Sequence, residues 1–204
     1  MESVTPLCSI PLWTKDDVRA LTSLERNCLV SQEEKITSGG GRNYITVNKQ
    51  LLDLEPMADF KALMTHYLDH YANTIMGLNA EFYITDSWAT RNPQNTGHTR
   101  HSHPNSIFSG IYYVDVEQGD LELAFDTLYN KDFRIKYDIK EYNLFNSSSW
   151  TIGPKPGLLV IFPSWVMHNV LNNPMPTDRR IIGFNSFVRG RFGEDSSVDN
   201  VEIK

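Results

Sequence analysis

Cysteine is scarce in this sequence, and this scarcity excludes some classes of protein. Cys8 and Cys28 are the two cysteines, and they do not have C-x-x-C spacing. Two cysteines are too few for the disulfide framework of a small secreted domain. Their scarcity fits a reducing compartment, so we expect a cytoplasmic protein.

Long apolar runs and excess positive charge are also missing. The longest apolar run, about Gly157 to Phe162, is far shorter than the ~20 residues of a membrane helix, so no membrane partner is expected. The start, Met1–Pro11, has no basic region of a secretory signal. Lys+Arg 19 against Asp+Glu 25 gives a net charge of −6. This balance, with only sparse basic residues such as Arg189 and Arg191 near the end, argues against a nucleic-acid partner.

The sequence is long enough for one domain with a proper core. Its 204 residues are 40% hydrophobic, and no linker divides them. We expect a single domain over 1–204, with a helical part over about 1–80 packed on a β core over about 81–190. One helix is expected from Thr14 to near Val30, and a clearer one from about Pro56 to Met76, with Gly77 as its stop signal. The apolar stripe of the second helix comprises Phe60, Leu63, Met64, Tyr67, Leu68, Tyr71 and Ile75.

After Gly77 the sequence changes to short β-type segments separated by Gly, Pro and Asn. The expected strands are Glu81–Trp88, Ser106–Val116, Leu121–Phe125, Phe133–Ile139, Gly157–Phe162, Val166–Leu171 and Arg180–Val188, besides a short one at Tyr44–Val47. Helices followed by many short strands, without βαβ alternation, indicate an antiparallel sandwich or jelly roll with helices on one side. The stretch from Asp126 to Trp150 has no clean period.

The six histidines are distributed unevenly. In an extended strand, His101 and His103 present two imidazoles on one face, which can chelate one metal ion. His168, beyond a predicted buried strand, can complete a facial set of three ligands with open positions for substrate or oxygen. The alternatives are an exposed pair in a polar loop and a structural histidine. Tyr112-Tyr113 and Arg179-Arg180 favour the metal site, because a metal beside tyrosine and arginine suits a chelating oxo-acid.

Four motifs in this order resemble the 2-oxoglutarate- and Fe(II)-dependent oxygenases, in particular a bacterial and bacteriophage branch. The branch pattern is H-x-H-P-x-S, S-G-x-Y-Y, G-x-L-V-x-F-P-S-W-x-x-H and R-x-x-x-x-F-N. Here the motifs are His101–Ser106, Ser109–Tyr113, Gly157–His168 and Arg179–Asn185. The resemblance covers about Trp88 to Val188. It places the protein in the host cytoplasm if a phage encodes it.

The resemblance implies a double-stranded β-helix core, a jelly roll of the cupin-like kind, with iron at one open end. It implies that His101, His103 and His168 bind Fe(II), and that 2-oxoglutarate and O2 are co-substrates. The implied reaction is hydroxylation of a small molecule or protein side chain, with release of succinate and CO2. Strand parity and the pattern favour Tyr113 and Arg179 as ligands of the distal carboxylate of 2-oxoglutarate. A β-bulge would reverse the parity for Tyr113, and Arg180 is the alternative to Arg179.

One departure from the superfamily keeps other functions open. The superfamily uses His-x-Asp/Glu where this sequence has His-x-His, which leaves three neutral ligands. Three histidines also suit a cupin-like or zinc enzyme that does not use 2-oxoglutarate, and a non-catalytic binding module is a further alternative. His66 and His70 are expected on the solvated face of the long helix, and His98 in an exposed polar loop.

Overall fold

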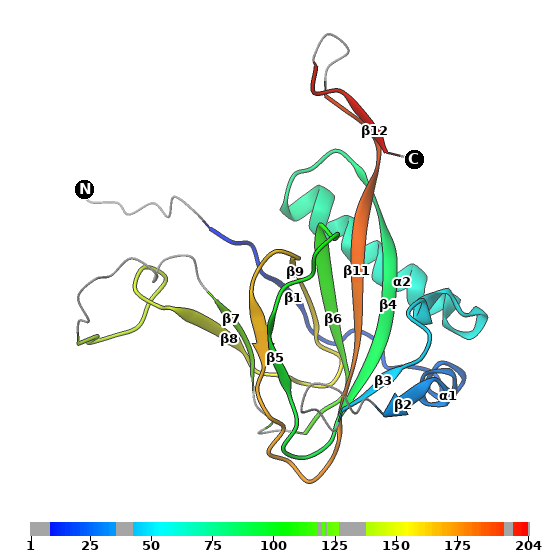
Figure 1. Ribbon diagram of the computed structural model, residues 1–204, viewed down its shortest axis with the longest axis vertical. Coiled ribbons are helices and arrows are strands. Elements are labelled where there is room, and N and C mark those ends of the chain that lie inside the picture. Colours follow the sequence, from blue (N-terminus) through cyan, green and yellow to red (C-terminus); the bar gives the residue numbers. More distant parts are fainter. Residues whose placement is uncertain are drawn as a thin grey trace.

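Two antiparallel sheets face each other in the computed structural model, which describes residues 9–35, 43–117, 120, 122–126, 138–193 and 198–203. The larger sheet has the order β1-β9-β6-β11-β4-β3-β2, with β12 beside β11, and the smaller has the order β5-β10-β7-β8 (Figure 1). The strands of the larger sheet are β1 (Trp13–Lys15), β2 (Glu33–Lys35), β3 (Tyr44–Thr46), β4 (Glu81–Asn92), β6 (Phe108–Asp115), β9 (Leu159–Pro163), β11 (Arg179–Phe192) and β12 (Val201–Ile203). Those of the smaller sheet are β5 (His98–His101), β7 (Leu123–Asp126), β8 (Ser149–Ile152) and β10 (His168–Val170).

This arrangement is a double-stranded β-helix with flanking helices, so the predicted fold class is confirmed. From β4 to β11 the chain passes back and forth between the sheets, as in a jelly roll, except that β7 and β8 form a hairpin within the smaller sheet. Most of the expected strands are present within a few residues of their predicted bounds. The strands β1, β2, β5, β8 and β12 were not among the expected strands, although an extended chain was expected at His101. The expected strand 133–139 lies outside the described residues except for its last two, which are not in a strand.

The first helix begins later than predicted. α1 spans Ser23–Ser31, and Thr14 lies in β1, where it pairs with Val160 of β9. Thr22 caps α1, because its side chain accepts from the Glu25 backbone N–H and the Glu25 carboxylate accepts from the Thr22 N–H. This reciprocal capping box defines the true start of the helix. Asp17 has a φ of 56°, which no helix residue adopts, and therefore separates β1 from α1.

The second helical segment has the predicted extent but changes type along its length. It combines the 3-10 turns Leu51–Asp53 and Glu55–Met57, α2 (Ala58–Asp69) and the π-helical segment His70–Ile75, and ends at Gly77 with a φ of +68°. Phe60, Met64, Leu68 and Tyr71 of the predicted stripe are buried, and Leu63 and Tyr67 are partly buried. Ile75 is 46% exposed, and Ala72 is buried in its place. A π-helical turn holds more residues than an α-turn, so it rotates the last residues out of the stripe.

The two hydrophobic clusters of the core lie on opposite faces of the larger sheet. The first joins α2 to the outer face of the sheet, where Phe60 packs edge-on against Tyr112 at 5.0 Å between ring centroids. The second lies between the sheets and includes Tyr113, Phe125 and Phe162. Tyr112 and Tyr113 thus face opposite sides, with Tyr113 inside. No helix among the described residues is long and apolar enough to cross a membrane.

Gly110 in β6 is packed so closely that any side chain there must displace an aromatic ring. A Cβ at this position would lie 2.1 Å from Cζ of Phe184, its cross-strand partner in β11. Phe184 is fully buried, so the ring cannot move into solvent. We expect Gly110→Ala to lower the free energy of unfolding by about 3 kcal/mol, at the upper end of overpacking costs. Urea unfolding measures the change.

A matched control is Gly153→Ala, because a Cβ there meets nothing within 4 Å. We expect it to leave stability nearly unchanged. Combining Gly110→Ala with Phe184→Leu should recover part of the loss, since the smaller side chain makes room for the new methyl group. Equal stability of Gly110→Ala and Gly153→Ala would contradict the close packing.

Candidate metal centre

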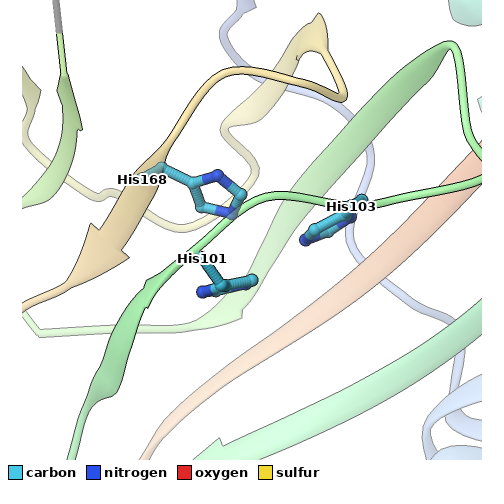
Figure 2. Close-up of side chains that lie close together, drawn as sticks. All are labelled: His101, His103 and His168. Atoms are coloured by element: carbon cyan, nitrogen blue, oxygen red, sulfur yellow. The ribbon is translucent and has the colours of Figure 1, made fainter.

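Three histidine side chains, those of His101, His103 and His168, lie close together (Figure 2). His101 ends β5, and His168 lies directly opposite it in the antiparallel neighbour β10. His103 follows two residues after His101 and stacks on it, with ring planes 16° apart and centroids 5.2 Å apart. Each residue offers one ring nitrogen, and the three nitrogens lie within 4.8 Å of one another. The structure thus brings together the three predicted ligands, and a neighbouring strand returns His168 to the pair.

Backbone carbonyls orient two of the three imidazoles. Nδ1 of His101 lies 2.7 Å from the Thr99 carbonyl oxygen, and Nδ1 of His168 lies 3.0 Å from that of Val166. A carbonyl oxygen accepts only, so the hydrogen-bond network assigns the proton to Nδ1 in both rings. Nε2 then carries the lone pair available to a metal ion. Metal-binding histidines in proteins are commonly oriented in this way.

The third imidazole is oriented by a side-chain relay. Nδ1 of His103 is hydrogen-bonded to Oδ1 of Asn185, whose Nδ2 donates to Oδ2 of Asp86 at 2.8 Å. A carboxylate accepts only, so it fixes which end of the Asn185 amide faces His103. Oδ1 therefore faces the ring, and Nδ1 of His103 carries the proton. All three histidines consequently have an Nε2 lone pair free for a metal.

Buried serine hydroxyls hold the Asn185 end of this relay. Ser109 Oγ donates to Oδ1 of Asn185 at 2.7 Å and lies 3.0 Å from Nδ1 of His103. Ser164 links Ser109 to Ser106 with oxygen–oxygen distances of 2.7 Å. Ser109 and Ser164 are fully buried. Ser109 therefore fixes an imidazole, while the neighbouring Gly110 makes room for the Phe184 ring.

Burial favours the neutral, metal-binding form of His103 and His168. It lowers the pKa of His168 to about 4 and also lowers the pKa of His103. Phe125 and Phe162 pack against His168 and supply the apolar surroundings. Neutral imidazoles are good ligands for Fe(II), Zn(II), Ni(II) and Co(II). The donor set therefore fits the iron implied by the resemblance, although it also accepts other divalent metals.

Arg179, the first residue of β11, lies in the interior of the β-helix. The residue is 1% exposed; its Nη1 donates to Oδ1 of Asp120 at 3.1 Å and its Nη2 to the Leu171 carbonyl at 2.9 Å. Tyr113 is buried near enough for the two side chains to interact electrostatically, and burial raises the pKa of its phenol. The two residues predicted to bind a carboxylate thus share one buried site. Asp120 belongs to this second site.

Arg180, the alternative to Arg179, lies on the other face of β11. Its Nε donates to Glu33 at 2.7 Å and its Nη1 to Asp115. Arg26 of α1 also binds Asp115, and Arg91 of β4 also binds Glu33. These ion pairs join α1 to β6, and β2 to β4 and β11. Arg180 therefore serves the packing of the N-terminal elements, outside the site.

His98 departs from the exposed loop position expected for it. It begins β5, its ring lies 6.2 Å from that of His101, and it interacts electrostatically with Arg179. Burial is the main cause that lowers its pKa to about 4. His66 is exposed as predicted, whereas the ring of His70 packs on that of Trp13, with 5.5 Å between the ring centroids. Neither belongs to the histidine cluster.

The two tryptophans that flank the motifs have different positions. Trp165 is 55% exposed. Trp88 of β4 packs on Gly183 of β11, where a Cβ would lie 2.8 Å from its indole, and its ring lies 5.7 Å from that of His103. Trp88 is therefore a wall of the candidate metal centre. Sequence reasoning did not find Asp86 or the Arg179–Asp120 pair, since no local pattern marks either.

Comparison with protein-family models gives a match over residues 86–185 to a family described as putative 2OG-Fe(II) oxygenase. This range contains the three histidines, Tyr113, Arg179 and both ends of the Asp86–Asn185 relay. No curated protein matches the sequence.

Solved structures with the same fold have low sequence identity to this chain. An oxidoreductase of the 2OG-Fe(II) oxygenase family from Burkholderia pseudomallei is 15% identical, with a TM-score of 0.63 over 86% of this chain and 84% of its own. A prolyl-4-hydroxylase from Pseudomonas putida is also 15% identical, with a TM-score of 0.57; the alignment covers 87% of this chain and 93% of the hydroxylase. HygX from Streptomyces hygroscopicus, with nickel and 2-oxoglutarate bound, is 10% identical, with a TM-score of 0.58; the alignment covers 87% of this chain and 82% of HygX. The match over residues 86–185 is thus a likeness to the 2OG-Fe(II) oxygenases, the solved structures show the shared fold, and the histidine cluster could hold the iron of that family.

Proposed function

We propose that this chain is an oxygenase that hydroxylates a C–H bond of a small molecule or a protein side chain, in the branch marked by its four motifs. The observation that carries this proposal is the cluster of three imidazole nitrogens within 4.8 Å of one another, in a double-stranded β-helix that also buries an arginine and a tyrosine. When bound, iron, 2-oxoglutarate and O2 supply the oxidant for the C–H bond and release succinate and CO2.

His101, His103 and His168 hold the metal in this proposal. Three ligands on one side of the ion leave its other positions for the co-substrate and O2. The three Nδ1 contacts fix the ring orientations before a metal arrives, which lowers the entropic cost of assembling the site. Phe125 and Phe162 exclude water beside His168 and so restrict side reactions of the oxidant.

Arg179 and Tyr113 bind the distal carboxylate of 2-oxoglutarate in this proposal. A guanidinium can hold a carboxylate through two parallel hydrogen bonds, and a phenol with a raised pKa stays protonated as a donor. Both groups are buried in the barrel, where such interactions are stronger than in water. The position of Arg179 at the start of β11 suits a co-substrate that extends inward from the metal.

Substrate is proposed to approach on the Trp88 side of the metal. Trp88 is partly exposed and lies against His103, so its indole offers an apolar surface near the reacting position. Other solved structures of this fold include a prolyl hydroxylase with a peptide fragment bound and HygX with hygromycin B bound. The fold thus accommodates both classes of substrate proposed here.

Anaerobic addition of Fe(II) and 2-oxoglutarate to the purified protein tests the proposal. We expect a weak visible charge-transfer band that requires both additions, because 2-oxoglutarate must chelate the iron to produce it. Arg179→Ala should weaken the band at limiting 2-oxoglutarate. Admission of O2 should then bleach the band and release succinate. Metal binding without a band at saturating 2-oxoglutarate would instead support the zinc-enzyme alternative.

A further inference from the structure

Among the residues that the structure describes, no carboxylate joins the three histidines as a ligand, yet a carboxylate lies one hydrogen-bonded residue away from His103. Asp86 of β4 accepts from Nδ2 of Asn185, and Oδ1 of Asn185 accepts from His103. Resting on the proposed function, we infer that Asp86 supplies the negative charge of the metal centre through Asn185. Asp86 is thus a positioning residue for the metal, acting through His103.

The chemistry of the relay supports a charge effect on the metal. A hydrogen bond accepted from Nδ1–H increases the electron density that the imidazole presents at Nε2. The Asp86 carboxylate polarises the Asn185 amide, which makes Oδ1 a stronger acceptor toward His103. The carboxylate of Asp86 also interacts electrostatically with the His103 ring. Nδ1 of His101 and of His168 is bonded to a neutral backbone carbonyl, whereas within the described part of the chain Nδ1 of His103 is linked to a carboxylate through Asn185.

Further hydrogen bonds fix the orientation of the Asn185 and Asp86 side chains in the relay. Ser109 and the fully buried Ser164 hold Oδ1 of Asn185 in place, while Thr85 donates to Oδ1 of Asp86 at 2.8 Å. The Asn185 amide therefore has one orientation, in which Oδ1 accepts from His103 and Nδ2 donates to Asp86. The relay joins β4 and β11 at a point where the register between them shifts. Its ends, Asp86 and Asn185, are the first and last residues of the family match.

Asp86→Asn tests this inference by removing the charge while keeping the shape of the side chain. The readout is the dissociation constant for Co(II) alone, measured by calorimetry and by the visible absorption of the bound ion. We expect Asp86→Asn to weaken Co(II) binding about 10- to 100-fold, the range found for groups that orient metal ligands. Glu81→Gln is the matched control, since it removes one charge from the same strand at a 70% exposed side chain. It should bind Co(II) as the unchanged protein does.

A charge-swapped variant separates an electrostatic role from a structural one. Asp86→Asn combined with Asn185→Asp keeps the net charge and moves the carboxylate directly against His103. We expect it to restore Co(II) affinity to at least that of the unchanged protein, which a merely structural role for Asp86 would not do. Asn185→Leu, which interrupts the relay and leaves Asp86 in place, should weaken binding as Asp86→Asn does. It serves as the second test if Asp86→Asn does not fold.

The charge-transfer band with Fe(II) and 2-oxoglutarate gives an independent readout. A less electron-rich His103 stabilises the iron d electrons, so the band of Asp86→Asn should shift to shorter wavelength. Co(II) affinity and band position equal to those of Glu81→Gln would overturn the role of Asp86. Co(II) binding that depends on Asp86, without any band, would overturn the oxygenase proposal and leave the relay standing. A protein whose histidines bind no Co(II) would overturn both.

Discussion

Replacing His101 with alanine is expected to weaken Co(II) or Fe(II) binding by about 100- to 1000-fold. Structural zinc sites with four ligands bind with about 10–16 kcal/mol, so one ligand contributes about 3–4 kcal/mol. His101 is the best of the three positions for this test because it is only partly buried, whereas His168 is 1% exposed and packs on two phenylalanines. Loss of His101 therefore removes a ligand without opening a large cavity.

The increase in Tm on metal binding provides a second measurement of the loss of metal binding in His101→Ala. A metal at about 100 times its dissociation constant stabilises the folded protein by about 2.7 kcal/mol, which raises the Tm of a chain of this size by about 5–10 °C. His101→Ala should unfold at nearly the same temperature as the unchanged protein without metal and should lose this increase. His66→Ala, at an exposed position on α2, is the control and should keep it. An undiminished metal-induced increase in His101→Ala would exclude the cluster as the metal site.

The histidine cluster was predictable because a local pattern and a fold rule both point to it. His101 and His103 are two apart, which places two rings on one side of an extended chain. An antiparallel neighbour then had to bring a third ligand back, and His168 follows a strand that the sequence marks as buried. The opposite orientations of Tyr112 and Tyr113 also follow from the alternation of side chains in β6.

The groups that support the cluster were not predictable, because their partners are distant in sequence. Asp86 lies 99 residues from Asn185, and Asp120 lies 59 residues from Arg179. Neither pair has a motif, and each forms only when the strands of the barrel are in register. The same holds for β1, which pairs with β9 and so overrides the helical pattern read from Thr14. Local propensity is a weak guide wherever tertiary pairing decides the conformation.

The exposure of Ile75 shows a different limit of sequence reasoning. A helical wheel assumes 100° per residue throughout, and that assumption holds along α2. It fails in the π-helical segment, where the extra residue rotates the face, so Ala72 is buried and Ile75 is exposed. The apolar pattern alone carries no signal for this change, because Ile75 and Ala72 are both apolar.

Asp120→Asn is expected to lower stability in the absence of ligands and to tighten binding of 2-oxoglutarate. Arg179 and Asp120 form an ion pair whose side chains are each 1% exposed. Removing one partner of such a pair costs about 3–5 kcal/mol, because the remaining charge stays buried without that counter-charge. For this chain length the Tm should fall by about 6–20 °C. If the distal carboxylate of 2-oxoglutarate binds Arg179, it supplies a counter-charge and should reverse most of this loss.

The same electrostatics sets the expected change in affinity. Asp120 is a negative charge beside the site proposed for the carboxylate of 2-oxoglutarate. Like charges about 5 Å apart repel by about 3 kcal/mol at an effective dielectric constant of about 20. We therefore expect Asp120→Asn to bind 2-oxoglutarate about 10- to 100-fold more tightly in the metal-loaded protein, measured anaerobically by titration of the charge-transfer band. Asp115→Asn is the matched control, because Asp115 pairs with Arg26 and Arg180 outside the barrel.

A double-mutant cycle with Arg179→Met completes the test. Arg179→Met alone should lose 2-oxoglutarate binding and leave Asp120 buried without this arginine, so it should also be destabilised. The combination with Asp120→Asn removes both charges, and we expect it to be more stable than either single variant, since uncharged groups replace a buried ion pair at little cost. Weaker 2-oxoglutarate binding in Asp120→Asn would mean that Asp120 holds Arg179 in place for the co-substrate. Tighter binding would show that the two carboxylates compete for one guanidinium, and that 2-oxoglutarate must displace an internal anion to enter.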